Sequence, residues 1–229
     1  MKKYLQIAID GPVASGTSTV ARLLAREMRI TYINTGAMYR ALTLACLRAG
    51  TGNSKIDRVV DLLKKTTITV EPPASHNHHA FIVRLNGEDV TDLIHAPGVS
   101  RETPKVAAIP QVRRIMVARQ QELAHHRSVV MEGRDIGLRV LPGADLKIYL
   151  TASVAVRARR RWLQHQVHGG QRTLEEEIED VKRRDLQDTT RDIDPLQKLP
   201  DAWEIDTTHL TPQEVVAKIK AELKRRKLI

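Results

Sequence analysis

The sequence predicts an α/β fold with a parallel central sheet, and two observations support this prediction. Residues 6–10 form a short apolar run that leads into a glycine-rich turn, and apolar residues at helical spacing follow the turn. A second strand-like and helix-like pattern comes directly after, over residues 31–47. Short strands that alternate with helices are typical of a parallel sheet, because parallel neighbours need a crossover connection between them.

The first elements can be placed individually. Residues 6–10 are expected to be a buried strand, and Val20, Leu24 and Met28 recur at the spacing of one helix face. Residues 31–33 are expected as a second strand, and residues 37–47 as a second helix that Gly50 closes. These elements would place the glycine-rich turn between a strand and a helix.

The middle of the chain has a different pattern. Residues 67–70 and 80–85 are rich in β-formers, and Asn86-Gly87 is a strong hairpin signal. Prolines at 72–73 and 97 border this part. We therefore expect a small antiparallel β insertion over about residues 66–95. The histidines in it, His76, His78 and His79, are interpreted as an exposed loop rather than a metal site.

The rest of the chain returns to helices and core strands. His125 and His126 are expected to cap the helix that precedes them, and Thr211 precedes Pro212 as an N-cap before a proline at the first helical position. The expected elements are, in order, helices at 100–108 and 111–124, strands at 128–131 and 146–150, helices at 153–166 and 174–186 separated by a break at 169–170, a strand at 203–206 and a helix from 212.

Composition limits the classes of function. Aromatic residues make up 3% of the 229, which argues against stacking on single-stranded nucleic acid, and no apolar run approaches the roughly 20 residues of a membrane span. The N-terminus lacks the features of a signal peptide, and the single cysteine, Cys46, fits a reducing compartment. We therefore expect a cytoplasmic protein without membrane partners.

The formal net charge of +10 favours anionic partners. Many arginines stand singly beside Gly, Asp or Thr, a placement that suits recognition of phosphates and carboxylates. A basic nucleic-acid-binding protein is an alternative, and it would bind with a strong salt dependence. Because the charges are scattered along the chain, we rank that alternative low and do not expect stable nucleic-acid binding.

The glycine-rich turn, residues 11–18, reads G-P-V-A-S-G-T-S and matches the Walker A pattern except that Thr17 replaces the lysine. Such a loop points backbone N–H groups at a phosphate, and Ser18 is placed to offer its hydroxyl to Mg²⁺. An ordinary glycine turn is the alternative. Without the lysine, another cation could substitute, the backbone with Mg²⁺ and other arginines could suffice, or catalysis could be impaired. The arginines at 157 and 159–161 are the nearest candidates for a replacement charge.

Six segments together closely resemble the bacterial-type cytidylate kinase family, in family order along nearly the whole chain. They are DGPVASG at 10–16, TGAMYR at 35–40, GEDVT at 87–91, VAAIPQVR at 106–113, EGRDIG at 132–137 and RRDLQDTTR at 183–191. The resemblance implies a P-loop NTPase three-layer fold over residues 1–229 as one domain, with a monophosphate-binding insertion at about 66–95 and a helical lid at about 157–172. It also implies a monomer that phosphorylates CMP and dCMP with ATP and Mg²⁺.

The resemblance also implies site residues. ATP would be bound by Gly11, Pro12, Val13, Ala14, Ser15, Gly16, Thr17, Ser18 and Thr19, with Ser18 at the metal. CMP would be bound by Thr35, Arg40, Arg113, Arg134, Asp135, Arg184, Asp188 and Arg191. The catalytic positions would be Arg134, Arg157, Arg161 and Thr17. Adjacent Arg and Asp side chains, as at Arg134-Asp135 or Arg184 with Asp188, could supply the donors and acceptor that cytosine requires, although Arg184 and Asp188 could also form a plain surface ion pair.

Four positions depart from the family pattern. Besides Thr17, Glu132 stands where the family usually has Asp, Pro104 where a serine contacts the monophosphate, and Leu138 where a threonine is common. The Thr17 replacement leaves open a kinase-like protein that holds nucleotides without turnover. Other P-loop kinases of small molecules, such as shikimate kinase, are a further alternative that the RRDLQDTTR segment does not favour.

Overall fold

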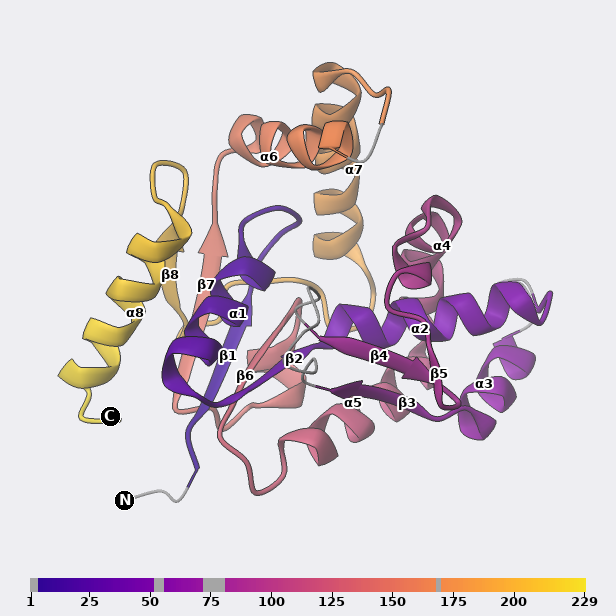
Figure 1. The fold of residues 1–229 in the computed structure, drawn as a ribbon, viewed down its shortest axis with the longest axis horizontal. Coiled ribbons are helices and arrows are strands. Elements are labelled where there is room, and N and C mark those ends of the chain that lie inside the picture. The colour runs from indigo at the N-terminus through magenta and orange to yellow at the C-terminus, as the bar shows by residue number, and fades with distance from the viewer. Residues whose placement is uncertain (1–3, 52–55, 72–80, 168–169) are drawn as a thin grey trace. The chain divides into compact units, whose positions relative to one another are not determined.

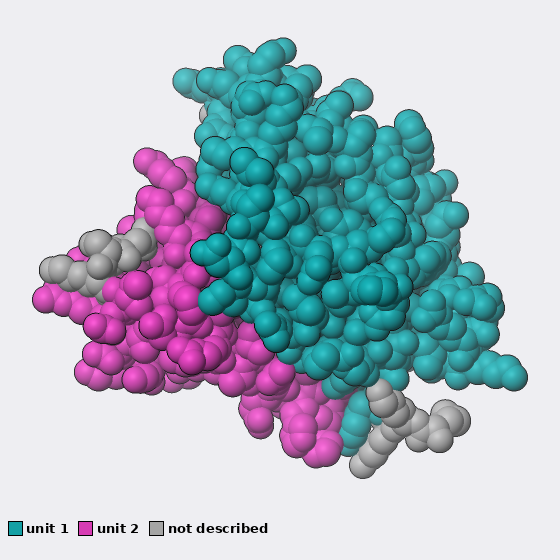
Figure 2. All heavy atoms as spheres, turned by 180° about the vertical axis from the view of Figure 1, so that it is seen from behind, with its two compact units in different colours: residues 1–30, 128–229 teal, residues 31–127 magenta. Residues whose placement is uncertain are grey.

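The computed structural model describes residues 4–51, 56–71, 81–167 and 170–229. These residues form two compact units (Figure 2), with unit 1 comprising Met1–Ile30 and Ser128–Ile229 and unit 2 comprising Thr31–Arg127. The expected segment with His76, His78 and His79 lies outside the described residues. Among the described helices, none is both long and apolar enough to span a membrane.

Unit 1 is built on a parallel sheet in which β6, β1, β7 and β8 are successive neighbours (Figure 1). Their bounds are β1 Gln6–Asp10, β6 Val129–Gly133, β7 Leu146–Thr151 and β8 Trp203–Asp206. Ile7, Ala8 and Ile9 of the central strand are wholly buried, as expected of a strand in a parallel sheet that is covered on both faces. The predicted parallel α/β core is confirmed.

The helices of unit 1 are of two kinds. α1 packs against β6 and α8, and α8 buries an apolar stripe that includes Val215, Ile219 and Leu223. α6 and α7 instead pack mainly against each other, beyond the end of β7 (Figure 1). Their bounds are α1 Thr17–Met28, α6 Val154–Val167, α7 Leu174–Thr190 and α8 Pro212–Arg225, with a short π-helical turn η2 at Ile136–Val140.

Unit 2 combines helices with the predicted antiparallel insertion, whose strands pair in the order β3, β4, β5. Asn86 and Gly87 both have positive φ, 52° and 88°, and make the predicted hairpin turn. The core gathers around α2, with Met38 and Leu42 fully buried. The elements are β2 Thr31–Asn34, α2 Thr35–Arg48, α3 Ile56–Lys65, β3 Ile68–Glu71, β4 Ile82–Leu85, β5 Glu88–Asp89, η1 Leu93–His95, α4 Pro97–Ala107 and α5 Pro110–Ala124.

The sequence patterns did not predict helix α3. Its buried stripe has only two fully buried members, Val59 and Leu63, because the helix is short. Arg119 of α5 stabilises its C-terminal end by donating to the carbonyl oxygens of Leu63 and Thr66, both at 2.9 Å. A cation at a helix C-terminus also complements the dipole, so part of the signal for α3 lies more than 50 residues away in the sequence.

Candidate active site

The phosphate loop, residues 11–18, connects β1 to α1 in a conformation that requires glycine at two positions. A Cβ atom on Gly11 would overlap the carbonyl oxygen of Leu150 and would lie 2.8 Å from the Ser15 hydroxyl oxygen. Gly16, the N-cap of α1, has φ of 101°, in the left-handed region that side chains disfavour. Ala14 also has a positive φ, 59°, so the loop turns back on itself as an anion-binding backbone does.

Thr17 begins α1 at the position of the missing lysine and is buried. A cavity of about 480 Å³ lies beside the loop, and Arg160 and Arg161 are among its walls. Its lining residues are Ala14, Ser15, Gly16, Thr17, Ser18, Thr19, Val20, Arg160, Arg161, Leu163, Gln164, Thr207, Leu210, Pro212 and Val215. Two of the four arginines predicted as sources of replacement charge therefore line the cavity.

Ser18 and Glu132 meet at the end of the loop, where the Ser18 hydroxyl donates to a Glu132 carboxylate oxygen at 2.8 Å. Hydroxyl and carboxylate oxygens are ligands that Mg²⁺ accepts, so these residues fit the ion implied by the loop. No cluster of three His, Cys, Asp or Glu suited to a metal occurs within the described ranges. In the sequence, Glu132 stands out only as a departure from the family pattern. The signal that could have identified it is its position at the end of the strand that pairs with β1.

Asp10, the last residue of β1, was also missed. Its two carboxylate oxygens accept the backbone N–H groups of Ile136 and Gly137, each at 2.8 Å. Burial raises the pKa of Asp10 to about 6, although the two hydrogen bonds act in the opposite direction. Asp10 thus joins the start of the phosphate loop to the EGRDIG segment.

Two of the motifs predicted to form the acceptor site come together within unit 1. Arg134 Nε lies 2.7 Å from Asp188 Oδ2, and Arg191 Nη2 lies 3.5 Å from Asp135 Oδ1. These two ion pairs join EGRDIG to RRDLQDTTR. The pairing of Arg184 with Asp188 that the sequence suggested is not formed, because Arg184 pairs with Asp180 at 2.8 Å.

The other predicted acceptor residues are carried by unit 2. Thr35 begins α2, and Arg40 on the same helix donates to the Ser100 hydroxyl at 2.8 Å. Arg113 of α5 is buried, and its guanidinium carbon lies 5.9 Å from the centre of the Tyr39 ring. Ser100 lies one turn before Pro104 on α4, so a serine hydroxyl is present near the place where the family serine is missing.

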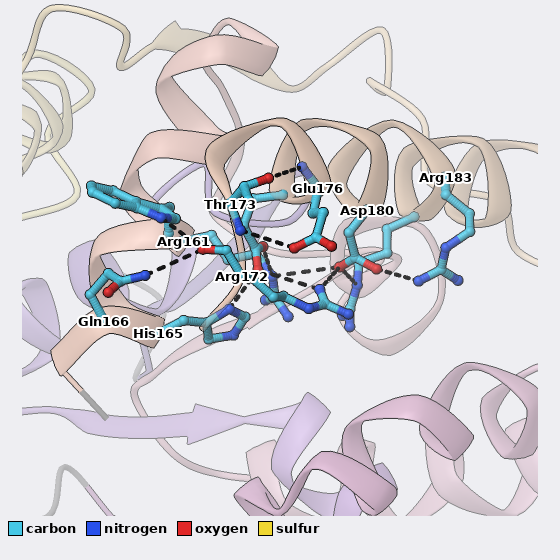
Figure 3. Close-up of polar contacts among 11 residues, drawn as sticks. Arg161, His165, Gln166, Arg172, Thr173, Glu176, Asp180 and Arg183 are labelled. Carbon is cyan, nitrogen blue, oxygen red and sulfur yellow. Dashed lines mark hydrogen bonds and ion pairs between the residues drawn. The ribbon is translucent and has the colours of Figure 1, made fainter. Parts of the chain in front are cut away.

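The two predicted lid arginines differ in their surroundings. Arg157 is buried, contacts both oxygens of Asp185 at 2.9 and 2.6 Å, and donates to the Val13 carbonyl of the phosphate loop at 3.2 Å. Arg161 faces the Glu177 carboxylate, with 3.1 Å between Nε and Oε2, inside a charged cluster on α6 and α7 (Figure 3). Arg157 therefore lies behind the loop, whereas Arg161 lines the cavity.

The cluster around Glu177 is dense and polar. Glu177 is fully buried and also lies within 2.6 Å of His165 Nδ1 and 3.3 Å of Arg172 Nη1. Asp180, one turn further along α7, contacts Arg183 and Arg184 (Figure 3 shows the first of these contacts). The helix pair α6–α7 is thus held mainly by charged side chains.

The parallel sheet, the loop that leads into α1 and the cavity beside it are the features of a nucleotide-binding fold of the P-loop class. A family model described as cytidylate kinase matches residues 7–225, and the chain therefore belongs to the cytidylate kinase family.

Curated relatives agree with this family. "Cytidylate kinase" of Geobacillus kaustophilus (strain HTA426) is 48% identical over 96% of each chain, and that of Bacillus pumilus (strain SAFR-032) is 47% identical over the same shares. A solved structure of an uncharacterized protein from Eubacterium ventriosum ATCC 27560 shares the fold, with a TM-score of 0.51, 12% identity and coverage of 96% of this chain and 98% of the other.

Proposed function

We propose that this protein transfers the terminal phosphoryl group of ATP to CMP and dCMP, acting as a monomer in the cytoplasm. The family membership and the names of the curated relatives support this reaction. The observation that carries the proposal is the pair of contacts, Arg134 with Asp188 and Asp135 with Arg191, that joins two acceptor motifs. A general nucleotide-binding protein would have no need of that arrangement.

At the donor end, the backbone N–H groups of the phosphate loop would hold the β-phosphate, and the helix dipole of α1 would add to the attraction. The adenosine part of ATP would take the cavity lined by Leu163, Leu210 and Val215. Arg160 and Arg161, in the wall of the same cavity, would supply the positive charge that Thr17 does not. In this assignment, two arginines of α6 replace the positive charge of the missing lysine.

Ser18 and Glu132 would hold Mg²⁺, directly or through water. When bound, the ion would neutralise charge on the transferring phosphoryl group. The contact between the Ser18 hydroxyl and Glu132 at 2.8 Å supports this assignment, because it places two oxygen ligands together at the loop. Glu132 is one methylene longer than the family's usual aspartate, and the hydroxyl still lies within its reach.

At the acceptor end, Arg40, Arg134 and Arg191 would hold the CMP phosphate, and Arg113 with Asp135 or Asp188 would recognise the base. Thr35 and Arg184 complete the proposed CMP set. Asp135 and Asp188 are engaged by arginines in the structure, so the substrate would have to exchange for part of those contacts. No protein nucleophile is required, since phosphoryl transfer needs mainly positioning and charge neutralisation.

The helix pair α6–α7 would act as the lid. Arg161 contacts Glu177 and Asp180, and it would change partners to reach the transferring phosphoryl group. Arg157 would contribute by holding the loop through the Val13 carbonyl. Closure of such a lid excludes water and so limits ATP hydrolysis.

A coupled assay of ADP formation tests the proposal. With ATP and Mg²⁺, we expect turnover with CMP and dCMP that clearly exceeds that with UMP, AMP or shikimate. The Thr17→Lys variant should be measured beside the wild type. Absence of turnover in the wild type together with activity in Thr17→Lys would indicate a nucleotide-binding relic, and absence in both would overturn the kinase proposal.

A further inference from the structure

Two carbonyl groups of the phosphate loop accept hydrogen bonds from side chains elsewhere in unit 1. Arg157 donates to the Val13 oxygen at 3.2 Å, and Thr207 Oγ1 lies 2.9 Å from the Ser15 oxygen. In a trans peptide unit, C=O and the following N–H point in opposite directions. Holding the Ser15 carbonyl toward Thr207 therefore fixes the Gly16 N–H, one of the loop N–H groups proposed to bind phosphate, in the direction away from Thr207.

Thr207 is the residue on which this arrangement depends most. It follows β8, is 2% exposed, and lies 192 residues from Ser15 in the sequence. Its hydroxyl has one hydrogen and two carbonyl oxygens within reach, Ser15 at 2.9 Å and Thr151 at 3.0 Å. The Thr151 oxygen already receives the Thr207 N–H at 2.8 Å, so the Ser15 oxygen is the one that needs the hydroxyl.

Arg160 is the third residue of this group of contacts, and it binds Thr207. Its Nη1 donates to Thr207 Oγ1 at 3.0 Å, and its Nη2 donates to the Thr207 carbonyl at 2.7 Å. Donation from Arg160 occupies a lone pair of the hydroxyl oxygen and leaves its hydrogen for a carbonyl acceptor. A charged donor also polarises the O–H group and strengthens the bond that this group donates.

We propose that Thr207 is a positioning residue for ATP binding, whose hydroxyl orients the phosphate loop through the Ser15 carbonyl. In a loop without lysine, the backbone N–H groups carry a larger share of phosphate binding, so their direction matters more. The inference rests on the proposed ATP site but not on the identity of the acceptor.

Three variants test this proposal. Thr207→Val removes the hydroxyl at nearly constant shape, and Thr207→Ser keeps it. Thr66→Val is the matched control, because Thr66 is also buried and its hydroxyl also donates to a backbone carbonyl, that of Leu62 at 2.7 Å, within unit 2. The dissociation constant of Mg·ATP is measured by calorimetry without CMP, with the melting temperature of each variant alongside.

We expect Thr207→Val to weaken ATP binding about tenfold, as the loss of one buried hydrogen bond would, and to raise the KM for ATP but not for CMP. Thr207→Ser should bind within about threefold of the wild type, and Thr66→Val should lose stability without losing affinity. Unchanged affinity in Thr207→Val, equal weakening in Thr66→Val, or failure of Thr207→Ser to restore binding would each overturn the proposal. Because CMP is absent from the titration, the dissociation constants test the proposal whether or not the wild type phosphorylates CMP.

Discussion

The phosphate loop and the helix pair α6–α7 are both rich in polar groups, but different contacts hold them. The loop is held by residues distant in sequence, such as Glu132 and Thr207, which bond its hydroxyl and carbonyl groups. The helix pair is held by ion pairs between two consecutive helices, with Arg161 and Glu177 as an example. The loop therefore depends on the folded core of unit 1, whereas the helix pair depends on local charges that can change partners.

This difference suits the roles proposed for the two regions. A loop that must present N–H groups in one direction needs anchors that do not move, and the ends of parallel strands provide them. A lid must open and close, so its contacts have to be exchangeable. Ion pairs meet that need where one side chain has two partners within reach, as Arg161 has in Glu177 and Asp180.

The largest effect is expected at Gly11. Gly11→Ala would place a Cβ atom onto the Leu150 carbonyl oxygen, and neither the strand end nor the loop can yield without losing its contacts. We expect a loss of about 3 kcal/mol or more in the free energy of unfolding, together with loss of ATP binding. Chemical denaturation and calorimetry measure the two effects.

Gly143→Ala is the matched control for that experiment. No atom lies within 4 Å of the Cβ position at Gly143, and its φ is not in the left-handed region. Stability and ATP affinity should both stay near the wild-type values. If Gly11→Ala behaved like Gly143→Ala, the loop backbone would be able to move enough to accept a Cβ atom. The loop would then not be held as firmly as we infer from its contacts.

A comparable loss of stability, without the added methyl group in the loop, is expected where loop and helix pair meet, at Asp185. Asp185→Ala would leave the buried Arg157 guanidinium without the carboxylate that it contacts at 2.9 and 2.6 Å. Breaking a buried pair from one side costs about 3–5 kcal/mol. The free energy of unfolding measures this loss. A loss below 1 kcal/mol would show that Arg157 finds its support in the Val13 and Ala152 carbonyls alone.

Acidity should affect the two regions in opposite directions. Burial raises the pKa of Asp10 from 3.8 to about 6, so its stabilising contribution is fully present below pH 3.8 and is lost as the pH rises through 6. At 1.36 kcal/mol per pH unit, the wild type should lose about 3 kcal/mol relative to Asp10→Asn over that interval. Unfolding by urea at a series of pH values measures the difference.

Asp180 of the helix pair gives the opposite sign. Burial alone would raise the pKa of Asp180, but Arg184, Arg183 and Arg161 outweigh burial and hold the pKa below 3.8. Its contribution is present above pH 3.8 and is lost as the pH falls through the folded pKa. The wild type should therefore gain stability relative to Asp180→Asn as the pH rises through this acidic range. If the stability of the wild type relative to Asp10→Asn and relative to Asp180→Asn changed with pH in the same direction, the two regions would not differ in this respect.

Sequence patterns predicted the features that depend on neighbours along the chain. The glycine loop, the Asn86-Gly87 turn and the N-cap Thr211 are such features, and the structure confirms all three. Arg184 shows where local patterns become ambiguous, because Asp180 and Asp188 lie four residues to either side of it. The structure pairs it with the N-terminal partner, the orientation that helices favour.

The features that escaped prediction depend on strand order. Asp10, Glu132 and Thr207 lie at or directly after the carboxyl ends of β1, β6 and β8. Their partners, such as Ser18 for Glu132 and Ser15 for Thr207, come within reach because the carboxyl ends of parallel strands meet at one edge. Each of these residues by itself resembles an ordinary polar residue after a strand. The roles of the predicted ATP- and CMP-binding residues stay predictions until ligand binding is measured.

The smallest expected effects compare two helix caps of the same kind. Thr173 and Thr211 each form a capping box, with Glu176 and Glu214 respectively, and replacing either threonine by alanine should cost about 1 kcal/mol of local helix stability. α8 buries four apolar side chains, so it unfolds with the core, and Thr211→Ala should lower the global free energy of unfolding.

Thr173→Ala should instead act locally. The buried residues of α7 are Glu177, Asp180 and Val181, only one of them apolar, so the first turns of this helix can open without the core. We expect amide hydrogen exchange in the first turns of α7 to become about fivefold faster, with little change in the global denaturation midpoint. An equal fall in that midpoint for both variants would mean that the helix pair unfolds together with the sheet, and that its ion pairs hold it as firmly as the core holds the phosphate loop.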